Sequence, residues 1–128
     1  MPERPRRNRK SAAFRGFAQE CDLNARNLLW PVFLHEADED VDIPSMPGQQ
    51  RLSLDSLWRA ADRAAELSIP GLVLFPSIPD AQKTAGAEEC FNPNGLIPRV
   101  IRKLKAPHPA LLVVTDVALD PHSSQGPD

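Results

Sequence analysis

Three short apolar runs, each bounded by proline or polar residues, alternate along the chain with two segments of helical periodicity. The runs cover residues 28–34, 71–75 and 111–119. A membrane-spanning helix needs about 20 apolar residues, so these runs are too short to cross a bilayer. Their continuous apolar character is typical of strands that are covered on both faces. The order strand, helix, strand, helix, strand predicts an α/β fold with a parallel sheet and right-handed crossovers.

The first helical segment is residues 53–67. Ser53 has the chemistry of an N-cap, and Asp55 would lie in the first turn, where the helix dipole favours a negative charge. Apolar residues recur at the spacing of one helix face, namely Leu54, Leu57, Trp58, Ala61 and Ala65. This pattern predicts an amphipathic helix packed on the sheet.

A second helix is expected after a polar loop at residues 77–92, with Asn92 or Asn94 as its cap. Ile97, Ile101 and Leu104 would share its apolar face. Pro98 fits such a helix only within the first turn, where it forfeits at most one helical hydrogen bond.

The chain has 128 residues and a mass of 14.1 kDa, which is the usual size of one hydrophobic core. A closed eight-unit α/β barrel takes about 250 residues, so this chain is too short to form one alone. Its 14 prolines punctuate loops and form no repetitive tract. The acidic segment 35–50 between the first strand and the first helix is expected to be a solvated loop.

The N-terminal segment is strongly basic. Residues 1–15 carry six basic side chains against Glu3 alone, namely Arg4, Arg6, Arg7, Arg9, Lys10 and Arg15. Such an arm indicates a disordered or partner-wrapping segment, a transit peptide or a nucleic-acid contact, although no aromatic residues alternate with the charges as nucleic-acid binding favours. Two distant cysteines, Cys21 and Cys90, indicate ordinary thiols in a reducing compartment.

In a parallel sheet the chemistry belongs at the carboxyl ends of the strands. The candidates are His35 and Glu36, then residues 77–80, then residues 116–128. Asp116 is expected inside the third apolar run, where a carboxylate is costly to bury unless it is paired or functional.

The last of these segments also holds a candidate metal site. Asp120, His122 and Asp128 could bind a divalent ion, but Pro121 and Gly126 equally fit a plain Asp-capped loop.

Residues 115–128, TDVALDPHSSQGPD, resemble the metal-region signature of the porphobilinogen synthase family, also called delta-aminolevulinic acid dehydratase, in its aspartate-rich variety. The resemblance spans nearly the whole chain. It includes RPRRNRK at 4–10, IPSMPGQQRLSLDSL at 43–57, LFPSIPD at 74–80 and CFNPNGLIPRVIRKLK at 90–105.

This resemblance implies the N-terminal part of a (β/α)8 TIM barrel, with an arm at residues 1–27 and barrel residues at 28–128. The arm would embrace a neighbouring subunit in a homo-octamer, which leaves no role for nucleic acid or membrane. The implied reaction condenses two 5-aminolevulinate molecules to porphobilinogen in tetrapyrrole synthesis. A cytoplasmic location is expected, with the plastid as the alternative.

The site residues follow from the same resemblance. Asp116 matches the active-site aspartate, while Ala118, Asp120 and Asp128 occupy the positions of three zinc-binding cysteines. Because alanine cannot coordinate a metal and carboxylates prefer hard cations, Mg²⁺ held by Asp120 and Asp128 is implied, with no organic cofactor. A mixed zinc site that also uses His122 is the competing possibility.

The chain departs from the family pattern at His122, Ser123, Gln125 and Pro127, and Asn94 replaces an aspartate. None of its four lysines, Lys10, Lys83, Lys103 and Lys105, matches either Schiff-base lysine of the family, so the chain alone is expected to be inactive. A truncated, non-catalytic paralogue that binds full-length subunits through its arm is the alternative function.

Overall fold

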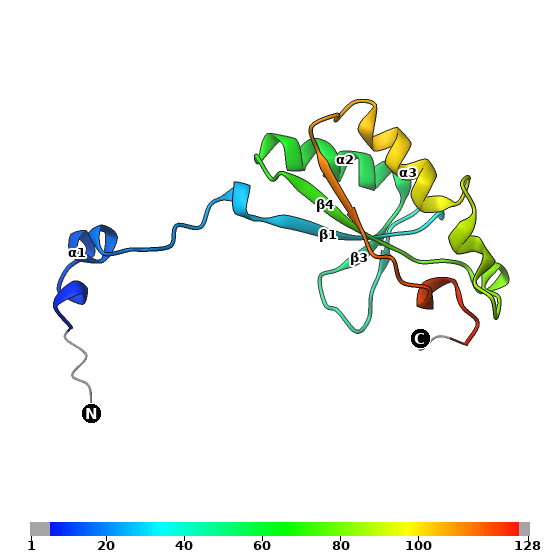
Figure 1. Ribbon diagram of the computed structural model, residues 1–128, viewed down its shortest axis with the longest axis horizontal. Coiled ribbons are helices and arrows are strands. Elements are labelled where there is room, and N and C mark those ends of the chain that lie inside the picture. The colour runs from blue at the N-terminus through cyan, green and yellow to red at the C-terminus, as the bar shows by residue number, and fades with distance from the viewer. Residues whose placement is uncertain (1–5, 126–128) are drawn as a thin grey trace.

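The computed structural model describes residues 6–125, except for the side chain of Arg7. A five-stranded sheet has the order β2-β3-β1-β4-β5, in which only β2 is antiparallel to its neighbour. The strands are β1 (Leu29–Leu34), β2 (Val41–Asp42), β3 (Gln50–Leu52), β4 (Gly71–Pro76) and β5 (Leu112–Thr115). The helices are α1 (Ala12–Phe17), α2 (Leu54–Glu66) and α3 (Leu96–Lys105) (Figure 1). Short 3-10 turns lie at Arg6–Arg9, Ala25–Asn27, Asp80–Gln82, Glu88–Phe91 and Asp120–His122.

The parallel α/β core predicted from the three apolar runs is confirmed: β1, β4 and β5 are parallel neighbours, joined through α2 and α3. Pro31 lies in the middle of β1. It is tolerated there because β3 pairs with β1 only at Phe33 and Leu34, so the part of β1 around Pro31 has β4 on one side only. The structure adds β2, which lies inside the segment 35–50 that was expected to be a solvated loop, and β3, which begins at the last residue of that segment.

Helix α2 begins where the sequence predicts. The Ser53 side chain accepts a hydrogen bond from the backbone N–H of Ser56, which is the bond of an N-cap. Leu57, Ala61 and Ala64 on its apolar face are fully buried. The prediction of an amphipathic helix against the sheet is therefore confirmed.

Helix α3 starts later than an asparagine cap requires, so that expectation is wrong. Its N-cap is Gly95, which makes no side-chain capping bond. The Asn92 side chain is used otherwise, because its amide donates to Glu89 and its carbonyl oxygen accepts from the backbone N–H of Asn94. Pro98 lies in the first turn, as expected.

One hydrophobic core lies between the two long helices and a single face of the sheet. Alternate strand residues such as Leu34, Leu72 and Leu74 are fully buried in it, together with Val100 and Leu104 of α3. Because side chains alternate along a strand, Phe33, Val73 and Phe75 face the opposite way. The helices therefore cover one face only.

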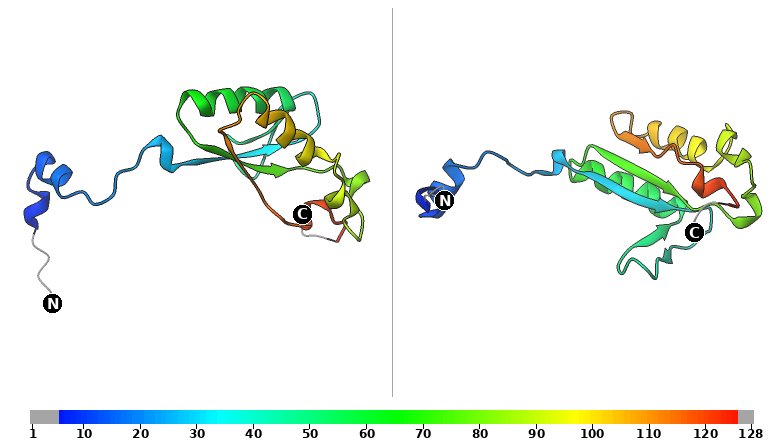
Figure 2. Two further views of the ribbon diagram at one scale, coloured as in Figure 1. Left: turned by 45° about the horizontal axis from the view of Figure 1, so that its top comes forward. Right: turned by 60° about the horizontal axis from the view of Figure 1, so that its bottom comes forward.

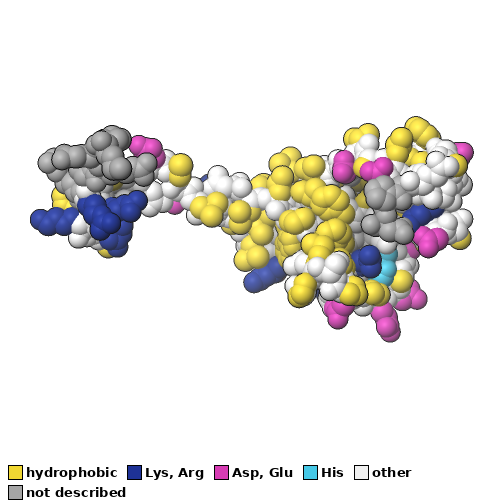
Figure 3. Space-filling view, turned by 90° about the horizontal axis from the view of Figure 1, so that it is seen from below, with side chains coloured by type: hydrophobic (Ala, Val, Ile, Leu, Met, Phe, Trp, Pro, Cys, Tyr) yellow, Lys and Arg dark blue, Asp and Glu magenta, His cyan; other side chains and the backbone are white. Residues whose placement is uncertain are grey.

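The uncovered face is apolar, and Figure 3 looks onto it. Leu112 is 55% exposed and Val114 is 39% exposed, although both lie on a strand of the sheet. The Phe33 and Phe75 rings stack on this face with their centroids 5.5 Å apart.

The N-terminal segment leads away from the sheet. Both views in Figure 2 show α1 apart from the layers formed by the sheet, α2 and α3. Phe14 and Phe17 of α1 are exposed. No helix in the described residues 6–125 is long and apolar enough to span a bilayer.

Candidate active site

The segment after β5 carries the chemistry that the sequence singles out. Strand β5 ends at Thr115, so Asp116 is the first residue beyond it and is exposed. The expectation that Asp116 lies inside a buried strand is wrong, because the strand stops before it. Its position at the carboxyl end of a parallel strand nevertheless agrees with a site residue.

Backbone contacts hold this segment beside the loop that follows β4. Thr84 and Ser123 form an isolated parallel bridge, in which Ser124 N–H donates to the Thr84 carbonyl over 3.0 Å. The Cys90 thiol lies 4.0 Å from the carbonyl oxygen of Ala118. Two loops that are far apart in sequence therefore form one wall at the carboxyl edge of the sheet.

A cavity of about 250 Å³ lies between this wall, the end of β4 and the start of α3. Its polar lining residues are Glu89, Cys90, Thr115, Asp116 and His122. The apolar part of the lining is Leu74, Phe75, Pro76, Leu96, Ile97, Pro98, Val117, Ala118 and Pro121. His122 Nδ1 is buried and makes no hydrogen bond within the described residues. Sequence reasoning proposed Asp116 and His122 for this region and missed Glu89 and Cys90.

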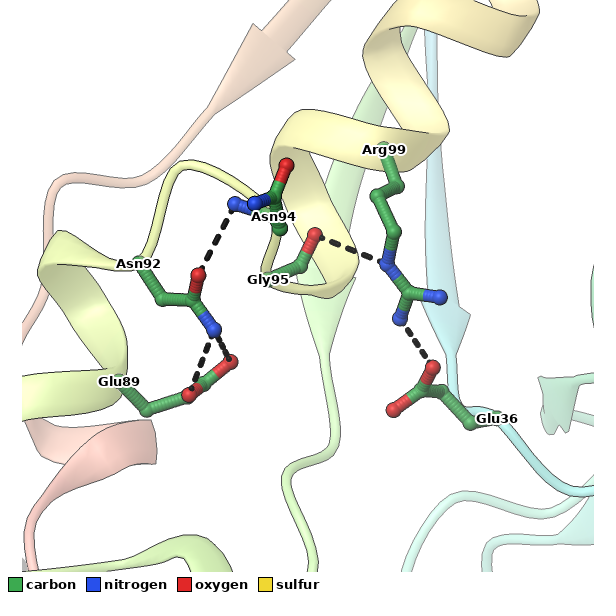
Figure 4. Close-up of polar contacts among 6 residues, drawn as sticks. All are labelled: Glu36, Glu89, Asn92, Asn94, Gly95 and Arg99. Atoms are coloured by element: carbon green, nitrogen blue, oxygen red, sulfur yellow. Dashed lines mark hydrogen bonds and ion pairs between the residues drawn. The ribbon is translucent and has the colours of Figure 1, made fainter.

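Figure 4 shows the polar contacts that position the start of α3 at this cavity. The side-chain amide of Asn92 donates to both carboxylate oxygens of Glu89 over 3.1 Å. These bonds fix the turn before Gly95. A Cβ atom at Gly95 would come within 2.9 Å of Glu89 Oε1 and 3.1 Å of the Asn92 carbonyl oxygen, so a larger residue there would displace the Glu89 side chain. Arg99 donates to the Gly95 carbonyl oxygen and forms an ion pair with Glu36 at the end of β1.

The other candidates at the strand ends have structural partners. His35 Nε2 lies 2.9 Å from the Glu39 carbonyl oxygen, and Asp80 pairs with Lys83 over 2.8 Å. Lys105, which matches no Schiff-base lysine of the family, donates to the carbonyl oxygens of Pro109 and Leu111 beyond the end of α3.

The residues expected to bind a metal are only partly described. Asp120 is exposed in the turn Asp120–His122, and Asp128 lies outside the described residues. Within residues 6–125 no group of three or more His, Cys, Asp or Glu side chains converges as metal ligands do. Asp120 lines a second cavity, on the other side of Phe75 and Pro76, which it shares with Arg51 and Lys83.

The acidic loop holds the most strongly engaged carboxylate of the described chain. Asp40 accepts hydrogen bonds from the Ser56 hydroxyl over 2.6 Å and from the Ser53 backbone N–H and hydroxyl over 2.8 Å each. These bonds, the one from Ser56 foremost, lower the pKa of Asp40 below its ordinary value of 3.8. The loop is therefore fixed to the first turn of α2 instead of being merely solvated.

A parallel sheet whose crossover helices cover one face only, with a cavity at its carboxyl edge, is the arrangement found in part of an α/β barrel. The chain belongs to the delta-aminolevulinic acid dehydratase family, whose sequence pattern it matches over residues 2–128. The resemblance to this family that the sequence indicated is thereby confirmed.

Individual relatives agree with this assignment. The chain is 47% identical over its whole length to the chloroplastic delta-aminolevulinic acid dehydratase of Selaginella martensii and 48% identical to that of Glycine max. It spans 31% of each of these relatives. The crystal structure of delta-aminolevulinic acid dehydratase (porphobilinogen synthase) from Toxoplasma gondii, in complex with the reaction product porphobilinogen, is 45% identical with a TM-score of 0.90. That match covers 97% of this chain and 35% of the Toxoplasma chain.

Proposed function

We propose that this chain supplies the N-terminal part of a porphobilinogen synthase, which condenses two 5-aminolevulinate molecules to porphobilinogen with loss of two waters. The family match over residues 2–128 and the similarity to a synthase with bound porphobilinogen support the proposal. The observation that carries it is the place of Asp116, at the carboxyl end of β5 and in the wall of the 250 Å³ cavity. Ligands of barrel enzymes bind at this end of the strands.

In this proposal Asp116 touches substrate. A carboxylate at the edge of a cavity can orient an ammonium group and exchange a proton with it. The apolar residues around it, among them Phe75 and Ile97, would exclude water from the reacting atoms.

The donor groups of the segment after β5 fit a hard cation better than a thiolate zinc site. Ala118 offers no ligand, whereas Asp120 and Asp128 offer carboxylate oxygens of the kind that Mg²⁺ prefers. We propose that Asp120 and Asp128 hold Mg²⁺, which would supply positive charge beside the reaction site. His122, whose Nδ1 is buried and makes no hydrogen bond within the described residues, is the only histidine in this segment.

Catalysis requires more of the barrel than this chain contains. Imine formation with aminolevulinate needs lysine amines of lowered pKa. Lys83 is engaged with Asp80, and Lys105 with two backbone carbonyls. We therefore propose that the 128-residue chain alone does not form porphobilinogen and that the active form is a homo-oligomer, an octamer by family resemblance.

A chimera tests this function directly. Residues 1–128 would replace the corresponding part of the Glycine max relative, and porphobilinogen formation from 5-aminolevulinate would be measured. The expected result is turnover within about tenfold of the parent, because the replaced part would keep the cavity and Asp116 in place. A chimera that assembles like the parent but forms no porphobilinogen would contradict the proposal.

The arm supports a second candidate function, a non-catalytic chain that binds full-length subunits. Its helix α1 lies apart from the sheet and exposes Phe14 and Phe17 (Figure 1). Co-expression with a full-length relative distinguishes the two. Co-purification that is lost on deletion of residues 1–27, together with an inactive chimera, would favour the second function.

We propose the plastid as the location, in preference to the cytoplasm expected from the sequence. The related proteins from Selaginella martensii and Glycine max are named as chloroplastic. Imaging a fluorescent fusion of the complete gene product in plant cells tests this, and a signal confined to the cytoplasm would contradict it.

A further inference from the structure

A series of polar contacts runs from the end of β1 to the wall of the 250 Å³ cavity (Figure 4). It begins at the Glu36 carboxylate, just beyond β1, which pairs with the Arg99 guanidinium. Arg99 Nε donates to the Gly95 carbonyl oxygen over 3.3 Å, and the Gly95 backbone N–H donates to the Asn92 carbonyl oxygen over 2.9 Å. The Asn92 side chain bonds the Glu89 carboxylate, which lines the cavity. The Arg99 side chain therefore links the loop after β1 to the segment that leads into α3.

The segment that Arg99 holds supplies one side of the cavity. Its lining residues share the stretch 89–98 and are Glu89, Cys90, Gly95, Leu96, Ile97 and Pro98. Arg102 also reaches back from α3 and donates to the Pro93 carbonyl oxygen over 3.0 Å. That bond stays within α3 and the loop before it, whereas Arg99 adds the contact with Glu36 on another loop. The position of this wall relative to β1 therefore depends on Arg99.

The exposure of the ion pair indicates what the contact can do. The Arg99 side chain is 44% exposed and the Glu36 side chain is 35% exposed, whereas Gly95 is buried. Ion pairs as open to water as this one contribute little to the free energy of unfolding. The pair can nevertheless hold a loop in one place, because the planar guanidinium bonds two groups in fixed directions. Its effect is therefore on the position of the wall and not on global stability.

We propose that Arg99 is a positioning residue of the synthase, which holds the wall formed by residues 89–98 against the end of β1 and thereby opposite Asp116. This inference rests on the proposed function and adds to it a residue that touches no substrate. Asp116 and the stretch 89–98 line the same cavity, so a shift of the wall changes the space in which the substrate is oriented. A misplacement of about 1 Å at a reacting centre can lower a rate about 100-fold.

The first part of the test follows the backbone amides of the 128-residue chain by NMR and needs no turnover. Glu36→Ala should shift the amide signals of Asn92, Gly95 and Leu96, although Glu36 is distant from them in sequence, because it releases Arg99. Arg99→Gln should shift the same signals. Arg63→Gln is the matched control, since it breaks an ion pair with Glu66 that lies wholly on α2, and it should shift none of them.

The second part measures kinetics in the chimera with the Glycine max relative. Arg99→Gln and Glu36→Ala should each lower kcat about tenfold or more and change KM less than about threefold, because the wall is displaced while the substrate contacts remain. Arg99→Lys keeps a charge for Glu36 but loses the fork, so it should restore part of kcat. The double variant should be no slower than Arg99→Gln, because both changes break the same series of contacts. Arg63→Gln should leave kcat unchanged.

Two results would overturn the inference. One is a kcat like that of the parent in an assembled Arg99→Gln chimera, and the other is a Glu36→Ala chain in which the amides of residues 92–96 do not shift. If Arg99→Gln does not assemble, Glu36→Ala decides the kinetic part. An unchanged chimera that is itself inactive would contradict the proposed function, whereas the NMR comparison would still decide whether Arg99 holds the wall.

Discussion

The carboxylate of Asp40 accepts a hydrogen bond of 2.6 Å from the hydroxyl of Ser56, which ties the acidic loop to the first turn of α2. The same carboxylate accepts hydrogen bonds from the backbone N–H and the hydroxyl of Ser53, the N-cap of that helix. A loop carboxylate thus adds negative charge at a helix N-terminus, where the dipole favours it. The loop that contains β2 is held at the edge of the sheet by this contact.

Replacing Asp40 by asparagine tests that relationship. The amide has one acceptor oxygen and no charge, so Asp40→Asn should lower the free energy of unfolding by about 1 kcal/mol. Denaturant unfolding followed by circular dichroism measures the change. Asp38→Asn in the same loop is the control and should alter stability little, because the Asp38 side chain has no hydrogen bond or ion pair within the described residues. Equal effects of the two substitutions would show that the Asp40 contacts do not stabilise α2.

The lowered pKa of Asp40 also predicts how stability depends on pH. Because its pKa in the folded chain lies below the ordinary 3.8, the stabilisation is fully present above that value and is lost as pH falls through the folded pKa. Asp40 is exposed, so we expect a loss of only a few tenths of a kcal/mol. Unfolding of the native chain and of Asp40→Asn should be compared between pH 6 and pH 3. A difference between them that does not shrink with acidification would contradict this prediction.

Adding a side chain at Gly71, at the start of β4, should disturb the packing of β4 against β5. A Cβ atom there would lie 2.7 Å from Leu112 Cβ and 2.8 Å from the Leu112 carbonyl oxygen, where β4 pairs with β5. Gly71→Ala should therefore lower the free energy of unfolding by about 1–3 kcal/mol through overpacking. Gly16→Ala in α1 meets nothing within 4 Å and is the matched control. If Gly71→Ala melts at the same temperature as the unchanged chain, β5 moves away from β4 without loss of stability, which would contradict the prediction.

Asp116→Asn in the chimera with the Glycine max relative tests the proposed site residue. If the Asp116 carboxylate exchanges protons with substrate, porphobilinogen formation should fall on the order of 100-fold or more without loss of assembly. Glu66→Gln on the exposed face of α2 is the control and should leave turnover unchanged. Near-normal turnover in Asp116→Asn would show that Asp116 has no catalytic role.

The metal proposal predicts how the same chimera responds to chelation. After stringent chelation, activity should not depend on zinc bound at the segment after β5, and any recovery should come from Mg²⁺. Replacing His122 by phenylalanine should leave that response intact. Recovery with stoichiometric zinc and not with millimolar Mg²⁺, abolished by His122→Phe, would instead favour a mixed zinc site.

Local sequence patterns were sufficient for the long elements and for the family. The apolar spacing from Leu54 to Ala65 and the cap Ser53 predict α2, because a helix face and its first turn are encoded within a few residues. The continuous apolar runs predict β1, β4 and β5 for the same reason. The motif at residues 115–128, which first indicated the family, is likewise a local pattern, and the family match over residues 2–128 includes it.

Tertiary structure decided the features that depend on partners distant in sequence. Strands β2 and β3 are two and three residues long, too short to show a periodicity, and they exist because β3 pairs with β1. The Asn92 side chain bonds Glu89 instead of capping α3, the exposed Asp40 carboxylate accepts a hydrogen bond from Ser56, and Arg51 lies beside Phe33 only because β3 pairs with β1. In each case a hydrogen bond or a strand pairing, formed only when the chain is folded, outweighs the local preference of the residue.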